Sequence, residues 1–453
     1  MQIAVAGATG FVGRRLVEAL AGEHKVIALA RRAPDFLNAT NQAVDVGNYE
    51  EALRALEGCD AAYYLIHSLD VGDFRARDLD LAKTFGAAAK AAGVKRIVYL
   101  GGLGEDPTSD HLLSRQEVGA ALGAKGVPVV ELRAAVIIGA GSVSYEMLRY
   151  LTERLPFMVC PRWVRTAIEP IALSDVLLYL EKSLSVEPGI YEIGSGEVTT
   201  YRDMISIYAR ERGLGPTVIV DIPLLTPRLS SHWVDFVTPV DTKVSHSLIE
   251  SLVTEVTVRD PNKTKDAFAI IPMPIAQAIR EALDNQLITA EATVMDRESG
   301  LLDGIYTERI EIPIDEALES ELNDDFDRIG GDLDWYGLDS AWRIRMWIGR
   351  LFGERWRLRR PEAVEPDAAV DWWRVVERSP NELVLRAEGW FFGEGWLGWR
   401  VRNGVLVQVG ILRPKGVVGF LYWKILQPVH RKVFRLQAEH RVVRARRRIK
   451  IGQ

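Results

Sequence analysis

Three glycines, Gly7, Gly10 and Gly13, stand three residues apart between an apolar run at 2–6 and a segment with apolar residues at helical spacing. This order predicts a strand, a tight turn and a helix. Gly7 would let the chain turn out of the strand, Gly10 would let the backbone approach a pyrophosphate, and Gly13 would let the helix pack closely on the sheet. The phosphates would lie at the positive N-terminus of the helix. A structural turn also needs glycine, so the flanking strand and helix are what favour nucleotide binding.

Two arginines follow the next apolar run, where an acidic residue usually binds the ribose hydroxyls of NAD(H). The guanidinium groups of Arg31 and Arg32 suit a 2′-phosphate, so the sequence favours NADP(H), with NAD(H) as the alternative cofactor. The two arginines could also be a solvated pair at a strand end. Asp45 and Val46, after the third stretch, could bracket the adenine, or Asp45 could be a turn residue.

His111 and Arg115 are the residues that could contribute proton chemistry. They lie four residues apart, so both would point from one face of a helix into the same crevice. A histidine transfers protons near neutral pH, but the neighbouring arginine disfavours its protonated form. Arg115 cannot give up a proton, although its guanidinium can hold a ribose or a phosphate. His111 is therefore either a general acid/base or a half-exposed histidine at a helix start.

The elements that would position these residues alternate between strand and helix. Strand-like runs at 25–30, 61–66, 96–101 and 128–133 are separated by helical stretches that include 49–56 and 79–92. This alternation predicts an α/β doubly wound Rossmann domain with a parallel sheet, in which ligands bind at the carboxyl ends of the strands.

The segments 7–13, 63–68, 96–102, 132–133, 168–176 and 191–195 carry a resemblance to a known family. Residues 1 to about 286 resemble the atypical short-chain dehydrogenase/reductases with an extended Rossmann domain. The segments 67–68, 100–104 and 111–119 are similar to an NmrA-like, NAD(P)-binding subgroup fused to a C-terminal domain of unknown function. In that subgroup His67 lies beside the cofactor. The predicted cofactor site comprises Gly7, Thr9, Gly10, Phe11, Val12, Gly13, Arg31, Arg32, Asp45, Val46, Ile66, His67, Ser68, Gly101 and Arg115.

The chain departs from the chemistry that this resemblance implies. The family places a Ser or Thr at the end of the fifth strand, and a Tyr followed four residues later by a Lys. Here residues 100–102 are Leu-Gly-Gly, and His111 and Arg115 stand at the Tyr and Lys positions. Two functions therefore remain open: an NADP(H)-dependent oxidoreductase or isomerase on a small apolar substrate, and a non-catalytic NADP(H)-binding sensor or scaffold. In the second case the C-terminal domain would bind a hydrophobic ligand or a partner.

The segment after 130 would form the other half of the crevice. Gly139 and Gly141 would let the chain bend over the nicotinamide end of the cofactor. Asp175 is interpreted as a helix-start cap in preference to a catalytic carboxylate, and a threonine at 199–200 as the cap of a second helix. The stretch 223–271 is expected to be a lid or a substrate-side subdomain.

A change of composition near residue 290 separates the predicted domains 1–289 and 290–453. Antiparallel strands are predicted at 306–314, 371–377, 383–388, 396–402 and 405–411, with a hairpin turn at Asn403–Gly404. Ile425, Val429, Val433 and Leu436 then indicate a long helix. The pattern resembles an α+β helix-grip (START-like) domain, whose relatives enclose an apolar cavity. Tryptophans that could either line such a pocket or fill a core are Trp390, Trp396, Trp399 and Trp423.

Composition restricts the remaining classes. With 48% hydrophobic residues, two cysteines and a net charge of −6, the chain reads as an ordinary cytoplasmic protein without a disulfide framework or a nucleic-acid partner. We expect no transmembrane segment and no metal site, because no apolar run is long enough and no histidines or carboxylates show ligand spacing. A weak case for peripheral membrane contact comes from a basic tail, which could equally be a solvated helix end: Arg441, Arg444, Arg446, Arg447, Arg448 and Lys450.

Overall fold

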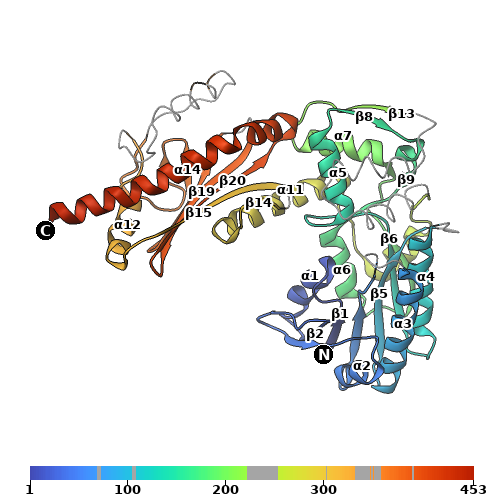
Figure 1. Cartoon of the computed structure of the whole chain (residues 1–453). Helices are drawn as coiled ribbons and strands as arrows, with labels where there is room; N and C mark the ends of the chain where they lie inside the picture. Colours follow the sequence, from blue (N-terminus) through green and yellow to red (C-terminus); the bar gives the residue numbers. More distant parts are fainter. Residues whose placement is uncertain are drawn as a thin grey trace. The chain divides into compact units, whose positions relative to one another are not determined.

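The computed structural model describes residues 1–68, 73–104, 109–221, 254–302, 304–331, 347, 350, 359–389 and 392–452. The chain divides into two compact units, Met1–Thr152 with Pro156–Leu283 and Glu153–Leu155 with Asp284–Gln453 (Figure 1). Most of the expected lid, from 223 to 253, lies outside the described residues. Among the helices in the described ranges, none has the length and hydropathy that crossing a membrane requires.

The first unit is built on a seven-stranded sheet in the order β11-β6-β5-β4-β1-β2-β3, and every neighbouring pair is parallel. This confirms the predicted doubly wound fold. The strands are β1 (Gln2–Ala6), β2 (Lys25–Ala30), β3 (Thr40–Ala43), β4 (Ala61–Tyr64), β5 (Arg96–Gly102), β6 (Val129–Ala134) and β11 (Gly189–Ile193). The apolar character of β1, β2, β4, β5 and β6 on both sides follows from helices that cover both faces of the sheet, whereas the edge strand β3 is polar.

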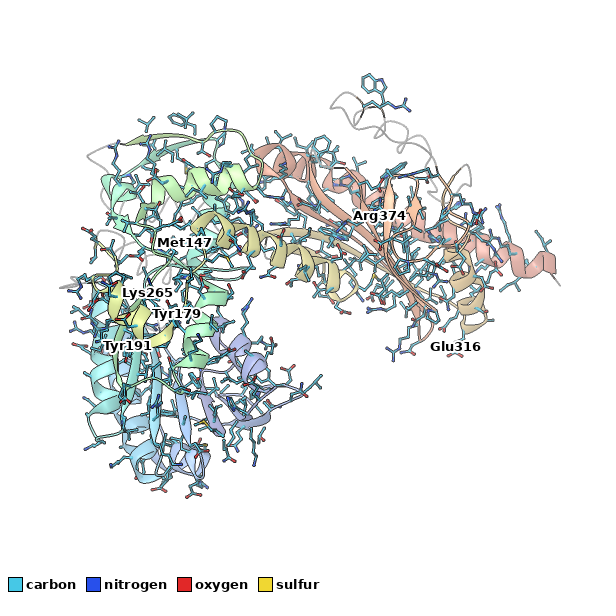
Figure 2. All side chains as sticks on the ribbon, turned by 180° about the vertical axis from the view of Figure 1, so that it is seen from behind. Met147, Tyr179, Tyr191, Lys265, Glu316 and Arg374 are labelled. Carbon is cyan, nitrogen blue, oxygen red and sulfur yellow. The ribbon has the colours of Figure 1, made fainter. Side chains whose placement is uncertain are left out.

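Two apolar layers hold these helices on the sheet. The helices α2 (Tyr49–Leu56), α3 (Phe74–Ala91) and α4 (Asp110–Gly123) bury their apolar residues against one face. The helices α1 (Phe11–Leu20) and α6 (Leu173–Lys182) cover the other face, together with Phe268 at the end of α10 (Pro261–Phe268). Phe268 packs at 5.1 Å from each of two rings on this unit, Tyr179 and Tyr191, which Figure 2 labels.

Short elements extend this unit beyond the main sheet. The pairs β7 (Ile137–Ile138) with β10 (Ile171–Ala172), β9 (Ala167–Ile168) with β12 (Thr199–Thr200), and β8 (Phe157–Cys160) with β13 (Val218–Asp221) accompany α5 (Val143–Arg154) and α7 (Tyr201–Glu211). The predicted cap of α7 is confirmed, because Thr200 Oγ1 accepts the Asp203 amide at 3.1 Å. The prediction for Asp175 is wrong. The N-cap of α6 is Ala172, and the buried Asp175 carboxylate accepts the Met273 amide at 2.7 Å, so it fixes a distant loop.

The second unit holds an antiparallel seven-stranded sheet in the order β14-β15-β20-β19-β18-β17-β16. The 37-residue helix α14 (Gly416–Gly452) packs on it, so the helix-grip arrangement is confirmed. Asn403 and Gly404 both have positive φ, as expected for the tight turn of the predicted hairpin. The strands are β14 (Gly300–Leu302), β15 (Ile305–Pro313), β16 (Ala369–Val370), β17 (Trp373–Ser379), β18 (Glu382–Ala387), β19 (Gly393–Arg402) and β20 (Val405–Pro414).

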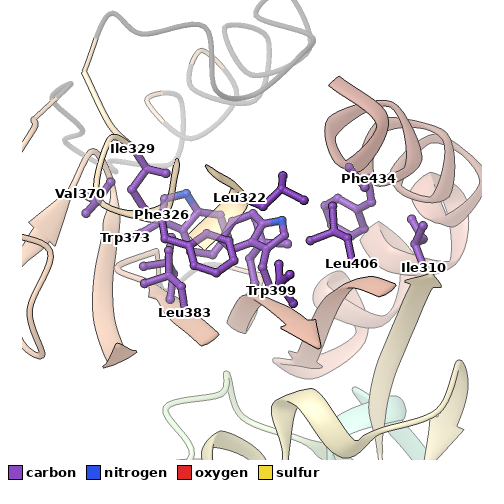
Figure 3. Close-up of a cluster of buried hydrophobic side chains, with 14 of the residues drawn as sticks. Ile310, Leu322, Phe326, Ile329, Val370, Trp373, Leu383, Trp399, Leu406 and Phe434 are labelled. Atoms are coloured by element: carbon purple, nitrogen blue, oxygen red, sulfur yellow. The ribbon is translucent and has the colours of Figure 1, made fainter. Parts of the chain in front are cut away.

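Tryptophans fill the cores on both faces of this sheet. On the α14 face, Trp399 packs with Leu406 and Phe434, as Figure 3 shows, and Trp423 belongs to the same cluster. On the opposite face, Trp396 packs with residues of the short helix Val294–Asp296, which follows α11 (Ile275–Ala292). Of the two predicted roles, core packing therefore holds for these three side chains, and Trp390 lies outside the described residues.

Candidate functional site

The glycine turn has the geometry that the sequence predicts. Gly7 has a φ of +87°, and its amide donates to the Leu29 carbonyl of the neighbouring strand β2 at 3.1 Å. A β-carbon at Gly13 would overlap the Gly7 carbonyl oxygen and lie 3.1 Å from Ala8 Cα. Helix α1 can therefore approach the turn this closely only with glycine at position 13. The close packing predicted for Gly13 is confirmed.

The N-terminus of α1 is suited to an anion. Gly10 is the N-cap and has no side chain that could accept the first amides of the helix, and the first turn holds no acidic residue. The first amides of a helix have no partner within the helix, and its dipole favours negative charge there. Phe11, Val12 and Gly13 can therefore present backbone donors to a phosphate group.

A cavity of about 280 Å³ begins at this turn. Its walls are mostly apolar and include the loop after β4, the end of β5, the segment after β6 and residues 254 and 256. Of the predicted site residues, those that line it are Gly10, Phe11, Val12, Gly13, His67, Gly101, His111 and Arg115. Further lining residues are Leu65, Leu100, Leu103, Leu112, Val136, Ile137, Ser142, Val143, Ser144, Ile168, Tyr201, Thr254 and Val256.

Arg31 and Arg32 lie beside the glycine turn and outside the cavity lining. Both side chains are exposed and follow directly on β2, whose Leu29 carbonyl accepts the amides of Gly7 and Ala8. Two guanidinium groups thus stand at the carboxyl end of the strand next to β1. Their contact with a 2′-phosphate stays a prediction.

Asp45 and Val46 have local structural roles. The Asp45 carboxylate accepts the Gly47 amide at 2.9 Å, so of the two alternatives for this residue the turn is what the structure shows. Val46 is buried in the apolar layer below α2 and α3. Thr9 is exposed at the tip of the glycine turn.

His111 and Arg115 both line the cavity from α4, so the predicted shared face is confirmed. Burial, and then the positive charge of Arg115, lower the pKa of His111 to about 3. The imidazole is therefore neutral at physiological pH, and the direction expected from Arg115 is correct. Arg115 Nη2 donates to the Leu100 carbonyl at 2.6 Å, which holds the guanidinium at the end of β5.

The glycine at the end of β5, Gly102, lies directly against α4. A β-carbon at Gly102 would lie 3.2 Å from Leu112 Cδ2 and 3.3 Å from Arg115 Cβ. The space that a serine side chain would need at the strand end is therefore restricted by the α4 residues. A serine at this position would therefore require Leu112 or the residue at position 115 to move by a few tenths of an ångström.

A buried acid below the cavity was not predicted. Asp78 on α3 is 3% exposed, and its Oδ2 accepts the amide of Ser68, which is also buried, at 3.3 Å. Burial raises the pKa of Asp78. The bond fixes the loop after β4, where Ile66 and His67 lie. The signal in the sequence was an acidic residue on the apolar face of a helix, four residues before Ala82.

Tyr201, Thr254 and the serines 142 and 144 were also missed. They approach the cavity from segments far apart in the sequence, and no spacing rule connects them with the glycine turn. Tyr201 opens α7, and burial raises the pKa of its hydroxyl, which is therefore protonated at physiological pH. It adds a hydroxyl donor to a largely apolar wall.

The sheet, the glycine turn and the helix N-terminus give the first unit the Rossmann fold of short-chain dehydrogenases and epimerases. In agreement, residues 7–149 match the family described as NAD(P)H-binding, and residues 302–437 match a family described as a protein of unknown function, DUF2867. The chain thus joins two domains, only the first of which has a described ligand.

One curated protein and several solved structures are similar to parts of the chain. The Auxiliary protein GraX of Staphylococcus aureus is 29% identical over 138 residues, which are 28% of this chain and 42% of that protein. The chain thus spans less than half the length of this relative. The UDP-glucose 4-epimerase of Thermotoga maritima, solved with UDP-glucose, has a TM-score of 0.51 at 16% identity, over 64% of this chain and 100% of the other. MoeE5, solved with UDP-glucuronic acid and NAD, has a TM-score of 0.50 at 17% identity with the same coverage. At these identities the two structures show the fold alone.

Proposed function

We propose that the first unit is an NADP(H)-dependent oxidoreductase or isomerase that acts on a small apolar substrate. The observation that carries the proposal is the cavity of about 280 Å³ that joins the N-terminus of α1 to His111 and Arg115. A nucleotide-binding turn without an adjoining cavity would be sufficient for a protein that only stores or senses the cofactor. A cavity that continues from it past mostly apolar walls provides space for a second molecule.

The preference for the phosphorylated cofactor depends on Arg31 and Arg32. The amides of Phe11, Val12 and Gly13 would hold the pyrophosphate, and the two exposed guanidinium groups beyond β2 would bind the 2′-phosphate. When bound, NADP(H) supplies or accepts a hydride.

The residues of the chain would exclude water and orient the substrate. Leu65, Leu100 and Val256 contribute apolar surface that favours a substrate with few polar groups. The neutral imidazole of His111 and the protonated hydroxyl of Tyr201 can donate hydrogen bonds to a substrate oxygen. Arg115, tied to the Leu100 carbonyl, adds a fixed positive charge on the same wall.

A second candidate function is a non-catalytic NADP(H) sensor. The specific observation in its favour is the pKa of about 3 for His111, which removes an imidazolium as the proton donor. In this case the C-terminal unit, if it is START-like in function, would bind a hydrophobic ligand or partner and respond to the cofactor.

Fluorescence titration of the full chain with NADPH and NADH tests the proposal. Replacing Arg31 and Arg32 by alanine should weaken NADPH binding by at least about 10- to 100-fold, since the loss of even one hydrogen bond to a charged group costs roughly 1.5–3 kcal/mol, and should leave NADH binding unchanged. Arg54→Ala, an exposed arginine on α2, is the control and should change neither. If the double variant keeps the preference for NADPH, the assignment of the arginines is wrong.

Turnover separates the two candidates. NADPH absorbance is followed with a panel of small apolar aldehydes, ketones, enones and quinones. If the wild type consumes NADPH with a member of this panel and a Gly13→Ala variant does not, the result supports the oxidoreductase or isomerase. Tight NADPH binding without consumption across the panel supports the sensor, and failure to bind either cofactor overturns both.

A further inference from the structure

The first half of α14 exposes an apolar stripe. Val418, Leu421, Ile425 and Val429 recur at spacings of three and four residues and are 52%, 46%, 69% and 51% exposed. They lie on the side opposite to the core-facing residues, which include Trp423. A helix face that points to water normally carries polar residues, so four consecutive aliphatic positions there call for a partner.

The charged residues of α14 are almost all positive. The helix α14 contains ten lysines and arginines and a single acidic residue, Glu439, although the whole chain has a net charge of −6. Lys424 and Lys432 are exposed beside and directly after the stripe, and Arg435 is exposed one turn after Lys432. The apolar stripe is therefore flanked by positive charge.

We infer that this face of α14 binds an anionic lipid surface, lying on it with the four aliphatic side chains inserted among the headgroups. An exposed aliphatic stripe flanked by lysines is the arrangement that binds such interfaces, through apolar burial and attraction to acidic lipids. A second copy of the chain fits less well, because a symmetric interface would place the lysines of one stripe against those of the other.

The surface differs from the one that the basic tail predicted. Arg441 is fully buried and donates to Asp325 at 2.9 Å, and Arg444 and Arg448 also bind that carboxylate. Three of the tail's five arginines therefore hold α14 on α12 (Glu319–Phe326), and their charge is balanced within the unit. The lipid-binding residues lie about four turns earlier, where the exposed side chains are apolar.

Vesicle co-sedimentation of the full chain tests the inference. The probes are phosphatidylcholine vesicles with and without about a third of phosphatidylglycerol. The wild type should bind the anionic vesicles at least about tenfold more tightly, and less at high salt. Replacing Leu421, Ile425 and Val429 by serine, or Lys424 and Lys432 by glutamate, should reduce this binding about tenfold or more.

Exposed aliphatic residues of the first unit provide the matched control. Leu37, Val198 and Ile271 are 99%, 63% and 91% exposed, and their replacement by serine should leave vesicle binding unchanged. Circular dichroism and NADPH titration, which report on folding and on the first unit, should be unaltered in every variant.

Two results would overturn the inference. One is wild-type binding that does not depend on phosphatidylglycerol or is kept by the serine variant. The other is a dimer, seen by light scattering, that the serine variant dissociates while neither protein binds vesicles, since the stripe would then cover a second copy.

Discussion

Replacing Gly13 with alanine should damage both the stability of the first unit and its cofactor site. The added β-carbon would overlap the Gly7 carbonyl oxygen and lie 2.9 Å from the carbonyl carbon and 3.1 Å from Ala8 Cα, where ordinary contacts are 3.4–4 Å. All three atoms belong to the backbone of the turn, so no flexible side chain can yield. Helix α1 or the turn must move, and with it the amides that face the phosphates.

The size of the expected loss of stability follows from this overpacking. Inserting a methyl group into a well-packed site costs about 1–3 kcal/mol. For a unit of this size, that lowers the melting temperature by roughly 2–12 °C. NADPH affinity should fall about tenfold or more, because displaced amides lose hydrogen bonds to a charged group that contribute roughly 1.5–3 kcal/mol each.

Thermal unfolding and NADPH fluorescence titration of Gly13→Ala measure these effects. Gly22→Ala is the matched control, because no atom lies within 4 Å of its added β-carbon and its φ is not in the left-handed region. The control should keep the melting temperature and the affinity. If Gly13→Ala behaves like Gly22→Ala in both assays, helix–turn contact does not set the cofactor site, and the reasoning fails.

Two further predictions concern charge. The pKa of His111 is about 3 in the folded chain against 6.5 when unfolded, so the unfolded chain binds more protons between these pH values and the free energy of unfolding decreases as pH falls below about 6.5. Urea unfolding at several pH values should therefore show a shallower pH dependence of this free energy for His111→Gln than for the wild type. An unchanged pH dependence would contradict the burial of this imidazole. Burial would raise the pKa of Asp325, but Arg441, Arg444 and Arg448 lower it overall, so Asp325→Asn leaves buried cations without a carboxylate and should cost about 3–5 kcal/mol. Asp327→Asn, whose partner Arg378 binds a 56% exposed carboxylate, should cost about 1 kcal/mol or less, and equal losses in urea unfolding would refute this comparison.

Local signals made much of the fold predictable. A glycine with positive φ at position 7, the hairpin at Asn403–Gly404 and the threonine cap of α7 are each determined by a few neighbouring residues. The five strands β1, β2, β4, β5 and β6 were predictable because parallel strands covered on both faces are apolar throughout, whereas the polar edge strand β3 gave no such signal. The same signals located the end of the cavity that the glycine turn and α4 form.

The other end could not be predicted, because it is assembled from distant segments. Tyr201 and Val256 reach the cavity only through the folded chain, and no periodicity relates them to Gly13. Asp175 shows the limit of local rules: an acidic residue in the first turn of a helix reads as a cap, yet it accepts an amide 98 residues away. The ion pairs of Arg441 and Arg444 were not predictable for the same reason, because their partner Asp325 lies on another helix, and the membrane contact of the basic tail stays a prediction.

The residues at the altered catalytic positions, Gly102, His111 and Arg115, lie close together at the end of β5 and on α4. Arg115 donates to the Leu100 carbonyl, and its Cβ, together with Leu112 Cδ2, lies close to where a β-carbon at Gly102 would stand. The same guanidinium, after burial, lowers the pKa of His111. Arg115 therefore adds to the effect of burial on His111, whereas the space at Gly102 is limited by Leu112 and by a β-carbon that a lysine at position 115 would also have. Among the described lining residues, the His111 imidazole and the Tyr201 hydroxyl each keep one protonation state at physiological pH.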